Sequence, residues 1–329
     1  MVLILSKGQI RSILSMSDCI SAVEEAFREF ELGTTQMPTR VSLSLGDKSG
    51  WLGAMPAYLA RAGSLSTKIV SVYGNNATLR GIPNVLATII LNDVETGRAE
   101  AILEGSYITA MRTGAVSGVA TKYLARSDSE VLGVFGAGVQ ARKQLEAVRE
   151  VRKIKTVIVF DTDRYRAQGF LAEISAASNL NASIASSTTE LVRASDIIVT
   201  ATTSTTPVFS GREVKPGTHI NAIGAFTPTS REIDDETVST SKIVVDSIDA
   251  SLAEAGDIII PLKEGVIQRQ DIRAELGEII TGKKPARTSL QEKTLFKSVG
   301  LGIQDAAVAK LVFEKAQRVG VGTQVDFEA

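Results

Sequence analysis

The stretch Glu130–Asp161 reads EVLGVFGAGVQARKQLEAVREVRKIKTVIVFD and has the pattern of a strand, a tight turn, a helix and a second strand. Two short apolar runs, Val131–Phe135 and Thr156–Phe160, are typical of buried parallel strands. Gly136-Ala137-Gly138 ends the first run, and a helix over Val139–Val151 follows the glycines. This order predicts a βαβ unit of the kind that binds a dinucleotide. The alternative is a glycine turn in another α/β domain.

Small residues in this stretch stand where a pyrophosphate would need them. Gly136 allows the turn, Gly138 lets the backbone approach the phosphates, and Ala141 permits close packing of helix and strand. The pyrophosphate would lie at the helix N-terminus, where unpaired N–H groups and the helix dipole favour an anion.

The acid that ends the second strand predicts the cofactor. Asp161 is placed to accept hydrogen bonds from the adenosine ribose, and it would repel a 2′-phosphate. We therefore expect NAD rather than NADP. Arg164 is close enough in sequence to weaken that preference.

Strands and helices continue to alternate after Asp161, which predicts a Rossmann-type, doubly wound parallel sheet. A helix is expected over Arg164–Ala177, and further strands over Ser183–Ser186, Asp196–Ala201, Thr218–Gly224 and Lys242–Asp246. Ligands of such sheets meet the carboxyl ends of the strands. Gly136, Asp161, Thr202 and Gly224 all fall at those ends.

The region before the dinucleotide stretch has a different pattern. A strand over Val2–Leu5 precedes a helix over Cys19–Leu32, which Ser17-Asp18 would cap and Gly33 would end. Mostly antiparallel strands are then expected at Val41–Leu45, Gly50–Ala54, Ser66–Tyr73 and Leu86–Asn92. A helix rich in small residues, Ser106–Ala125, leads into the dinucleotide domain.

The end of the chain is expected to return to the first domain. The run LFKSVGLGIQ leads into a helix over Ile303–Arg318, and Val319–Phe327 could add a strand there. We therefore predict a mixed α+β domain of residues 1–118 with 303–329, for which the family resemblance described below implies substrate binding and dimerisation, and a NAD-binding domain of residues 119–302. The strands of the first domain offer too few partners to cover their faces and edges, so we expect at least a dimer.

Composition limits the kinds of function. The 329 residues carry a net charge of −1, so we expect no nucleic-acid or membrane partner. Cys19 is the only cysteine, which makes an internal disulfide impossible and a cysteine zinc site implausible. We see no basic n-region for a signal peptide and no apolar run near the ~20 residues of a membrane helix. A cytoplasmic protein is expected.

Acid–base and nucleophilic side chains are scarce. His219 lies at the start of a buried strand and Cys19 in an amphipathic helix, and both are better read as core residues. Lys68 lies in an apolar strand, where burial would lower its pKa; the alternative is a lysine that reaches the surface. Arg112 could bind a carboxylate or form an ordinary ion pair, and Arg40 is the third charged candidate.

Several long motifs together resemble the ornithine cyclodeaminase/μ-crystallin family, and most of all its archaeal-type alanine dehydrogenases. They are MPTR with Arg40, AMPAY, TKIV with Lys68, ATIILNDVETG, AMRTGAVSG with Arg112, FGAGVQA, TATTSTTPV, INAIGAFTP and LFKSVGLGIQD. The match extends over nearly the whole chain and keeps the order of the motifs. It implies a two-domain subunit whose first domain pairs with a second subunit.

The resemblance also implies roles for individual residues. Arg40, Lys68 and Arg112 match the residues that hold the substrate carboxylate. Cofactor contacts are expected, partly from the glycine turn itself, at Asn84, Arg112, Gly136, Gly138, Val139, Gln140, Asp161, Arg164, Thr202, Thr203, Ile223, Gly224, Lys297 and Ser298. Among them Asn84 and Lys297 fall where the family approaches the nicotinamide.

One departure from the family bears on the reaction. Cyclodeaminases carry a catalytic aspartate two residues before the proline that is Pro228 here, and this chain has Phe226 at that place. The resemblance therefore implies an NAD-dependent L-alanine dehydrogenase, in which Lys68 would transfer protons. The alternatives are a cyclic imine reductase such as a pyrroline-2-carboxylate reductase, an ornithine cyclodeaminase, and a binding protein of the μ-crystallin type.

Overall fold

The computed structural model describes residues 1–48, 50–177 and 179–327 and divides the chain into two compact units. The first unit comprises Met1–Arg112 and Leu301–Ala329, and the second comprises Thr113–Gly300. The boundaries predicted from sequence, 118/119 and 302/303, lie a few residues further along the chain. They differ because the first boundary falls inside one continuous helix, where the residue pattern does not change.

The first unit contains an eight-stranded sheet in the order β16-β1-β7-β6-β5-β4-β2, with β3 paired to β4. Its strands are β1 (Val2–Leu5), β2 (Thr35–Gln36), β3 (Val41–Leu45), β4 (Gly50–Leu59), β5 (Ser64–Tyr73), β6 (Val85–Asn92), β7 (Ala99–Glu104) and β16 (Thr323–Val325). Strands β3 to β7 are antiparallel, as predicted. The C-terminal segment does return as a strand, because β16 pairs antiparallel with β1.

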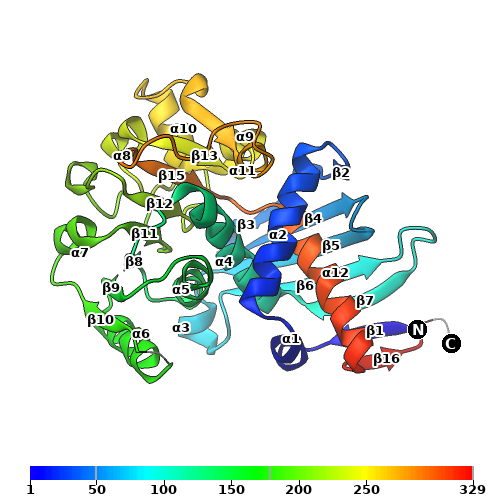
Figure 1. Cartoon of the computed structure of the whole chain (residues 1–329). Helices are drawn as coiled ribbons and strands as arrows, with labels where there is room; N and C mark the ends of the chain where they lie inside the picture. The colour runs from blue at the N-terminus through cyan, green and yellow to red at the C-terminus, as the bar shows by residue number, and fades with distance from the viewer. Residues whose placement is uncertain (49, 178, 328–329) are drawn as a thin grey trace. The chain divides into compact units, whose positions relative to one another are not determined.

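Helices of the first unit pack on one face of this sheet (Figure 1). They are α1 (Lys7–Ile13), α2 (Met16–Glu31) and α12 (Gly302–Val319), and α12 contacts β4, β5, β6 and α2. The short helix α3 (Asn76–Arg80) lies between β5 and β6 in the chain. The predicted cap of α2 is wrong. Ser15, not Ser17-Asp18, accepts the N–H of Asp18, because starting the helix at Met16 adds one more buried side chain to its apolar face.

The second unit contains an eight-stranded sheet that is parallel throughout, in the order β10-β9-β8-β11-β12-β15-β13-β14. The strands are β8 (Val131–Phe135), β9 (Thr156–Phe160), β10 (Asn181–Ile184), β11 (Ile197–Thr200), β12 (His219–Ala222), β13 (Lys242–Val245), β14 (Ile272–Glu275) and β15 (Thr294–Lys297). The fold class predicted from the sequence is confirmed.

The helices that accompany the second sheet begin with α4 (Gly105–Leu124), which the two units share along the chain. They continue with α5 (Val139–Val151), α6 (Arg164–Ala177), α7 (Thr188–Ala194), α8 (Asp235–Thr240), α9 (Ile248–Glu254), α10 (Gly256–Lys263) and α11 (Leu276–Ile280). Short 3₁₀ turns occupy Gly46–Lys48, Gly211–Glu213 and Arg269–Asp271. The predicted bounds of α5, α6, β8 and β9 agree with the structure.

Apolar side chains cover both faces of the second sheet, which explains its continuous hydrophobic runs. Leu132 and Val134 of β8 pack on one face with Leu145 of α5 and Phe170 of α6. Phe135 packs on the other face, in a second cluster. Because these strands are parallel, the carboxyl ends of β8, β9, β11, β12 and β15 all lie at the same end of the sheet.

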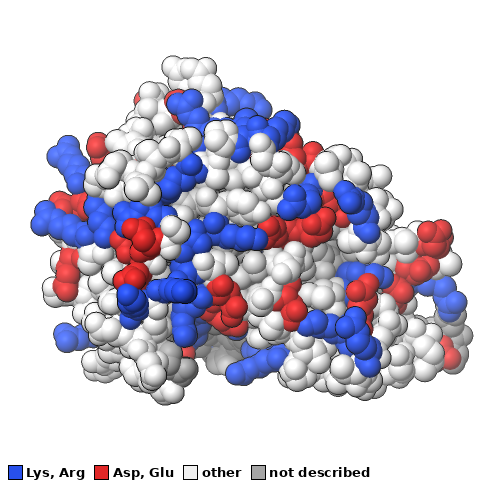
Figure 2. Space-filling view, in the orientation of Figure 1, with Lys and Arg blue, Asp and Glu red and all other residues white. Residues whose placement is uncertain are grey.

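The surface carries charged side chains of both signs. Figure 2 shows basic and acidic side chains interspersed on the face in view. Among the helices in the described part of the chain, none is long and apolar enough to cross a membrane.

Candidate functional site

Lys68 is buried within the first unit. It lies on β5, its side chain is 1% exposed, and its Nζ is 2.5 Å from Oδ2 of Asp305. Asp305 belongs to the first turn of α12, which packs against β5. The lysine therefore does not reach the surface, and the reading of Lys68 as a buried amine is confirmed.

Arg112 binds the same carboxylate. Its Nε is 3.2 Å from Oδ1 of Asp305, and its Nη1 donates to Oε1 of Gln304 at 2.7 Å. Arg112 is 6% exposed. One buried carboxylate thus holds two cations side by side, which is the arrangement that a buried charge requires.

The environment changes the acidity of Lys68. Burial, with help from the charge of Arg112, lowers the pKa of Lys68 to about 7, while Asp305 acts to raise it. The charge of Arg40 also lowers this pKa, so Arg40 lies within electrostatic reach of the amine. An amine that titrates near neutral pH can both donate and accept a proton.

Asp305 is a residue that sequence reasoning missed. It ends the motif LFKSVGLGIQD, but an acid in the first turn of a helix is most often an exposed partner of the helix dipole. The only signal for burial was the apolar context around it, since all of Gly302–Ala309 is buried.

The glycine turn of the second unit fits a pyrophosphate. Gly136 has φ +93°, and a Cβ there would lie 2.6 Å from the carbonyl oxygen of Ala201. A Cβ at Gly138 would meet nothing within 4 Å, and the first turn of α5 carries no acidic residue. Val139 is exposed, and Oε1 of Gln140 is buried with no hydrogen-bond partner among the described residues. This helix start is open to an anion.

Asp161 directly follows β9 and binds the turn itself. Its Oδ2 accepts the N–H of Ala137 at 2.7 Å, and its Oδ1 accepts the N–H of Asp163 at 2.8 Å. A carboxylate has about four acceptor positions, so it can still accept from a ribose hydroxyl. Arg164 begins α6 and is exposed.

The other predicted cofactor residues are divided between exposed and engaged positions. Thr203 is exposed at the end of β11, whereas Ile223 is buried after β12. Ser298 donates its hydroxyl to Asp246 at 2.8 Å. In the first unit, Oδ1 of Asn84 accepts the N–H of Ala77 at 2.8 Å, and this bond joins the loop before β6 to helix α3.

Lys297 does not present a free ammonium. Its side chain is fully buried, its Nζ is 2.7 Å from Oδ2 of Asp257, and it donates to the carbonyl oxygen of Ala225. A direct side-chain contact of Lys297 with the cofactor would have to displace these partners. Lys297 is itself the last residue of β15, where it pairs with Ala222 of β12.

His219 and Cys19 are core residues. The ring of His219 hydrogen-bonds to Thr294 and Asn221, and burial lowers its pKa to about 3, so the imidazole is neutral. Cys19 is buried in α2. Among the described residues, no group of His, Cys, Asp or Glu side chains is arranged to hold a metal ion.

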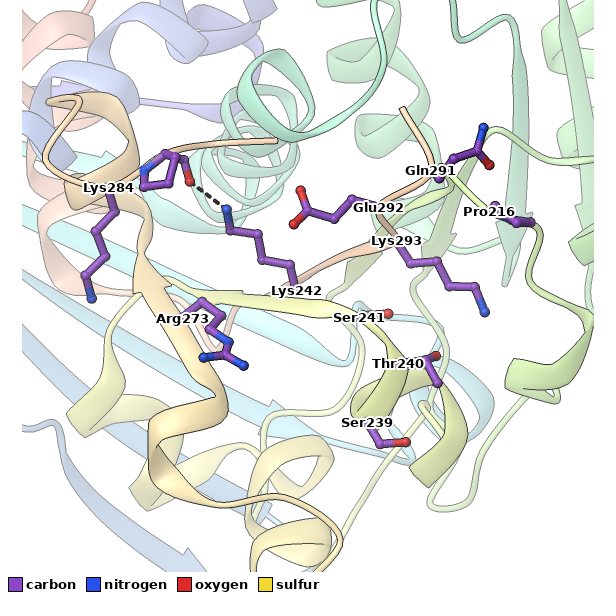
Figure 3. A pocket seen from close by; sticks show the side chains of 11 residues that line it. Pro216, Ser239, Thr240, Ser241, Lys242, Arg273, Lys284, Gln291, Glu292 and Lys293 are labelled. Carbon is purple, nitrogen blue, oxygen red and sulfur yellow. Dashed lines mark hydrogen bonds between the residues drawn. The ribbon is translucent and has the colours of Figure 1, made fainter. Parts of the chain in front are cut away.

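A cavity of about 570 Å³ lies at the amino ends of the strands of the second sheet, where β12, β13 and β15 begin (Figure 3). It contains none of the predicted site residues. Lys242 already donates to the carbonyl oxygens of Pro285, at 2.7 Å, and Ala286. Lys284 pairs with Glu278 at 3.1 Å. Because none of the predicted site residues lines it, this cavity is not the candidate active site.

The chain is similar to known proteins over its whole length. The sequence pattern of the ornithine cyclodeaminase/mu-crystallin family matches residues 2–320. The alanine dehydrogenase of Archaeoglobus fulgidus is 42% identical over 325 residues, which are 99% of this chain and 98% of that protein.

Two solved structures have the same fold. The Δ1-pyrroline-2-carboxylate reductase of Thermococcus litoralis, in complex with NADH and L-proline, is 48% identical with a TM-score of 0.96, covering 98% of this chain and 100% of that one. An archaeal alanine dehydrogenase dimer with bound NAD is 41% identical with a TM-score of 0.94, covering 99% of each chain. With the βαβ turn and the Lys68–Asp305–Arg112 cluster in place, this chain belongs to the ornithine cyclodeaminase/mu-crystallin family.

Proposed function

We propose that the protein is an NAD-dependent oxidoreductase that reduces the C=N bond of a small 2-imino carboxylate, with Δ1-pyrroline-2-carboxylate as its preferred substrate and L-proline as the product. The observation that carries the reaction type is the buried Lys68–Asp305–Arg112 cluster. The 48% identity to the reductase bound to NADH and L-proline supports the choice of substrate. Asp161, at the end of β9, supports NAD over NADP.

The residues of the first unit provide binding and a proton. Arg112, with Arg40, would hold the substrate carboxylate through charge-assisted hydrogen bonds. Arg112 and Lys68 contact the same carboxylate of Asp305, so they lie close enough to serve adjacent groups of one small molecule. The carboxylate and the imine of a 2-imino acid are such adjacent groups.

The reaction balances with one hydride and one proton. NADH, when bound, supplies the hydride that forms the new C–H bond at C2 of the substrate. The ammonium of Lys68 would give its proton to the imine nitrogen as the C=N bond becomes a single bond. The neutral amine of Lys68 then recovers a proton from solvent, which a pKa of about 7 makes easy at neutral pH.

The second candidate is the L-alanine dehydrogenase expected from the sequence. It is supported by 42% identity to the Archaeoglobus fulgidus enzyme. Its reductive direction uses the same imine step, preceded by addition of ammonia to pyruvate and loss of water, for which Lys68 would serve as both acceptor and donor. The two candidates therefore differ in how the imine arises and not in how it is reduced.

Two other readings fit less well. A cyclodeaminase would need an acid near the far amine of its substrate, and the resemblance puts Phe226 in that place. A protein that only binds a ligand has no use for a buried lysine whose pKa is brought near 7.

The test is a substrate panel with purified protein. Oxidation of NADH is followed with Δ1-pyrroline-2-carboxylate, with the six-membered cyclic imine, and with pyruvate plus ammonia. We expect the highest kcat/KM with Δ1-pyrroline-2-carboxylate and tighter binding of NADH than of NADPH. A higher kcat/KM for pyruvate plus ammonia would make alanine dehydrogenase the better assignment. No NADH oxidation with any of them would refute the proposal.

A homodimer is proposed as the working form. The helices of the first unit lie on one face of its sheet, and exposed apolar side chains lie on strands of the same sheet: Val41 and Leu43 on β3, Ile69 on β5 and Leu86 on β6. Ile69 alternates with the inward-facing Lys68. A contiguous apolar sheet face favours association, and the archaeal relative is a dimer.

A further inference from the structure

Glu232 is a fully buried carboxylate in the loop between β12 and α8, and its sequence context did not single it out. Its Oε1 accepts the N–H and the hydroxyl of Thr202, each at 2.7 Å. Its Oε2 accepts the N–H of Gly224 at 2.7 Å and the hydroxyl of Thr200 at 2.8 Å. One side chain thus binds the carboxyl ends of two neighbouring strands, β11 and β12.

The close approach of Glu232 explains why residue 224 is a glycine. A Cβ at Gly224 would lie 2.6 Å from Oε1 of Glu232 and 2.3 Å from the carbonyl oxygen of Thr202. The loops after β11 and β12 are therefore packed directly on this carboxylate. Gly136, in the glycine turn after β8, also lies against Ala201, which precedes Thr202 in the chain.

The backbone of Glu232 is fixed by a second buried carboxylate, that of Asp257. Its backbone N–H donates to Oδ1 of Asp257 at 2.7 Å, and the N–H of Ile233 donates to the same oxygen at 2.9 Å. Asp257 is paired with the fully buried Lys297 at the end of β15. The buried chain Lys297–Asp257–Glu232 therefore joins the ends of β11, β12 and β15.

The sheet order indicates which part of a dinucleotide would meet these loops. A dinucleotide binds across the point where the strand order reverses, which here is between β8 and β11. The glycine turn after β8 and Asp161 after β9 belong to the adenosine half. The nicotinamide half would therefore lie over the ends of β11 and β12.

We propose that Glu232 is a positioning residue that fixes Thr202 and Gly224 as the floor of the nicotinamide half of the site. The inference rests on the proposed function, since it concerns NADH. Glu232 would act without touching the cofactor. It sets where the backbone of the two loops lies, and hence where the nicotinamide ring can lie.

The Glu232→Gln variant tests this in a specific way. Each oxygen of Glu232 accepts a backbone N–H, which can only donate. The amide of glutamine has one acceptor oxygen and one NH₂ group, so either orientation sets an N–H against the N–H of Thr202 or of Gly224. This holds whether or not Glu232 carries a proton, because a protonated carboxyl oxygen still accepts and an amide nitrogen does not.

A matched control lies at the amino ends of β8 and β11 in the same sheet. Oδ2 of Asp196 accepts the N–H groups of Glu130 and Val131, both at 3.0 Å, before β8 and β11 begin. In Asp196→Asn the amide oxygen can keep both N–H groups, while the NH₂ group faces Arg126 and Lys215, which Oδ1 contacts at 3.4 and 2.8 Å. The disturbed contacts lie far along the strands from their carboxyl ends. The substitution should lower thermal stability without changing the nicotinamide half.

The measurement is the affinity of each protein for NADH and for ADP, which contains only the adenosine and the pyrophosphate. We expect Glu232→Gln to weaken NADH binding about tenfold or more and ADP binding by less than about threefold, with kcat lowered at saturating NADH. Asp196→Asn should keep both affinities and kcat. If Glu232→Gln does not fold, Glu232→Asp, which is too short to reach both strand ends, should show the same difference.

The outcomes separate this inference from the proposed function. If the unmodified protein does not bind NADH, the proposed function fails. If it binds NADH, but Glu232→Gln or Glu232→Asp weakens NADH and ADP equally, or weakens neither, then Glu232 is only a structural residue and the inference is overturned.

Discussion

Lys68 lies on a strand whose other inward residues are small or apolar, and its amine is kept there by Asp305. Burial disfavours the charged form, and the nearby arginines disfavour it further. The carboxylate of Asp305 works in the opposite direction. The balance leaves an amine that can change protonation at neutral pH, which a surface lysine cannot do.

Replacement of Lys68 should separate chemistry from binding. Lys68→Ala should lower kcat by about a hundredfold to ten-thousandfold, because a general acid is lost. Lys68→Arg should not restore the rate, since a guanidinium keeps its proton in proteins. Both variants should bind NADH normally in a fluorescence titration, because the glycine turn belongs to the other unit. A Lys68→Arg enzyme with near-normal kcat would reduce Lys68 to a binding residue.

Replacement of Asp305 should shift the pH dependence of kcat/KM. Imine reduction needs Lys68 protonated, so kcat/KM should fall as the pH rises through about 7, the pKa of Lys68 in the free enzyme. Asp305 acts to raise this pKa, so Asp305→Asn should move the decline to lower pH. A pH profile of kcat/KM for NADH-dependent reduction measures it. A decline that moved to higher pH, or stayed in place, would contradict the proposed pairing.

Residues with an informative sequence context were predicted, and residues whose role depends on distant partners were not. Lys68 and Arg112 stand in apolar stretches, where a charge is conspicuous. Asp305, Glu232 and Asp257 look like ordinary surface acids until the fold brings Lys68 and Lys297 to two of them. Lys297 was expected near the nicotinamide, but its partners are internal.

At the scale of elements, the glycine turn after β8 shows two different uses of glycine. Gly136 needs its positive φ, and the neighbouring Ala201 leaves no room for a side chain. Gly138 has an ordinary φ of −85° and free space around it. The protein itself therefore has no need of glycine at position 138, whereas a pyrophosphate at the start of α5 does.

Alanine at position 136 should therefore lower stability, and alanine at position 138 should not. Gly136→Ala should destabilise the fold by about 1–3 kcal/mol through backbone strain. Gly138→Ala should keep the melting temperature and weaken NADH binding, because its methyl group would occupy the path of the phosphates. Thermal unfolding and NADH titration of the two variants measure this. Unchanged NADH affinity in Gly138→Ala would place the pyrophosphate elsewhere.

The predictability of elements followed local pattern. Central strands such as β8 and β9 have unbroken apolar runs, and their bounds were predicted correctly. The edge strand β10 was placed two residues late, because an edge strand needs fewer apolar residues. Strands β14 and β15 were not predicted, since β14 alternates with charges and the four residues of β15 end in a lysine that only the fold buries.

At the scale of the whole molecule, the sequence predicted that the second sheet is parallel but not the order of its strands. β15 inserts between β12 and β13, although β13 comes earlier in the chain. No local pattern encodes which distant strands become neighbours. The existence of two units and the return of the C-terminus to the first could be expected, because the family resemblance extends along the full chain.

The apolar sheet face of the first unit should decide the oligomeric state. Leu43→Glu places a charge on an exposed side chain of β3, 61% accessible, which is one of the apolar residues of the proposed dimer face. We expect it to shift the protein from dimer to monomer in light scattering at micromolar concentration. Leu290→Glu, at a 68% exposed leucine of the second unit, is the control and should stay dimeric. Dissociation by neither variant would move the interface to another surface.

Imine reduction by this protein can be tested most directly by following one hydrogen atom. The protein is incubated with Δ1-pyrroline-2-carboxylate and NADH deuterated on both hydrogens of nicotinamide C4, and the product is analysed by mass spectrometry and NMR. Transfer of hydride to C2, with the N–H proton from Lys68 and solvent, predicts L-proline that carries one deuterium, bound to C2. Proline without deuterium, or NADH that is not consumed, would contradict imine reduction as the function of this protein.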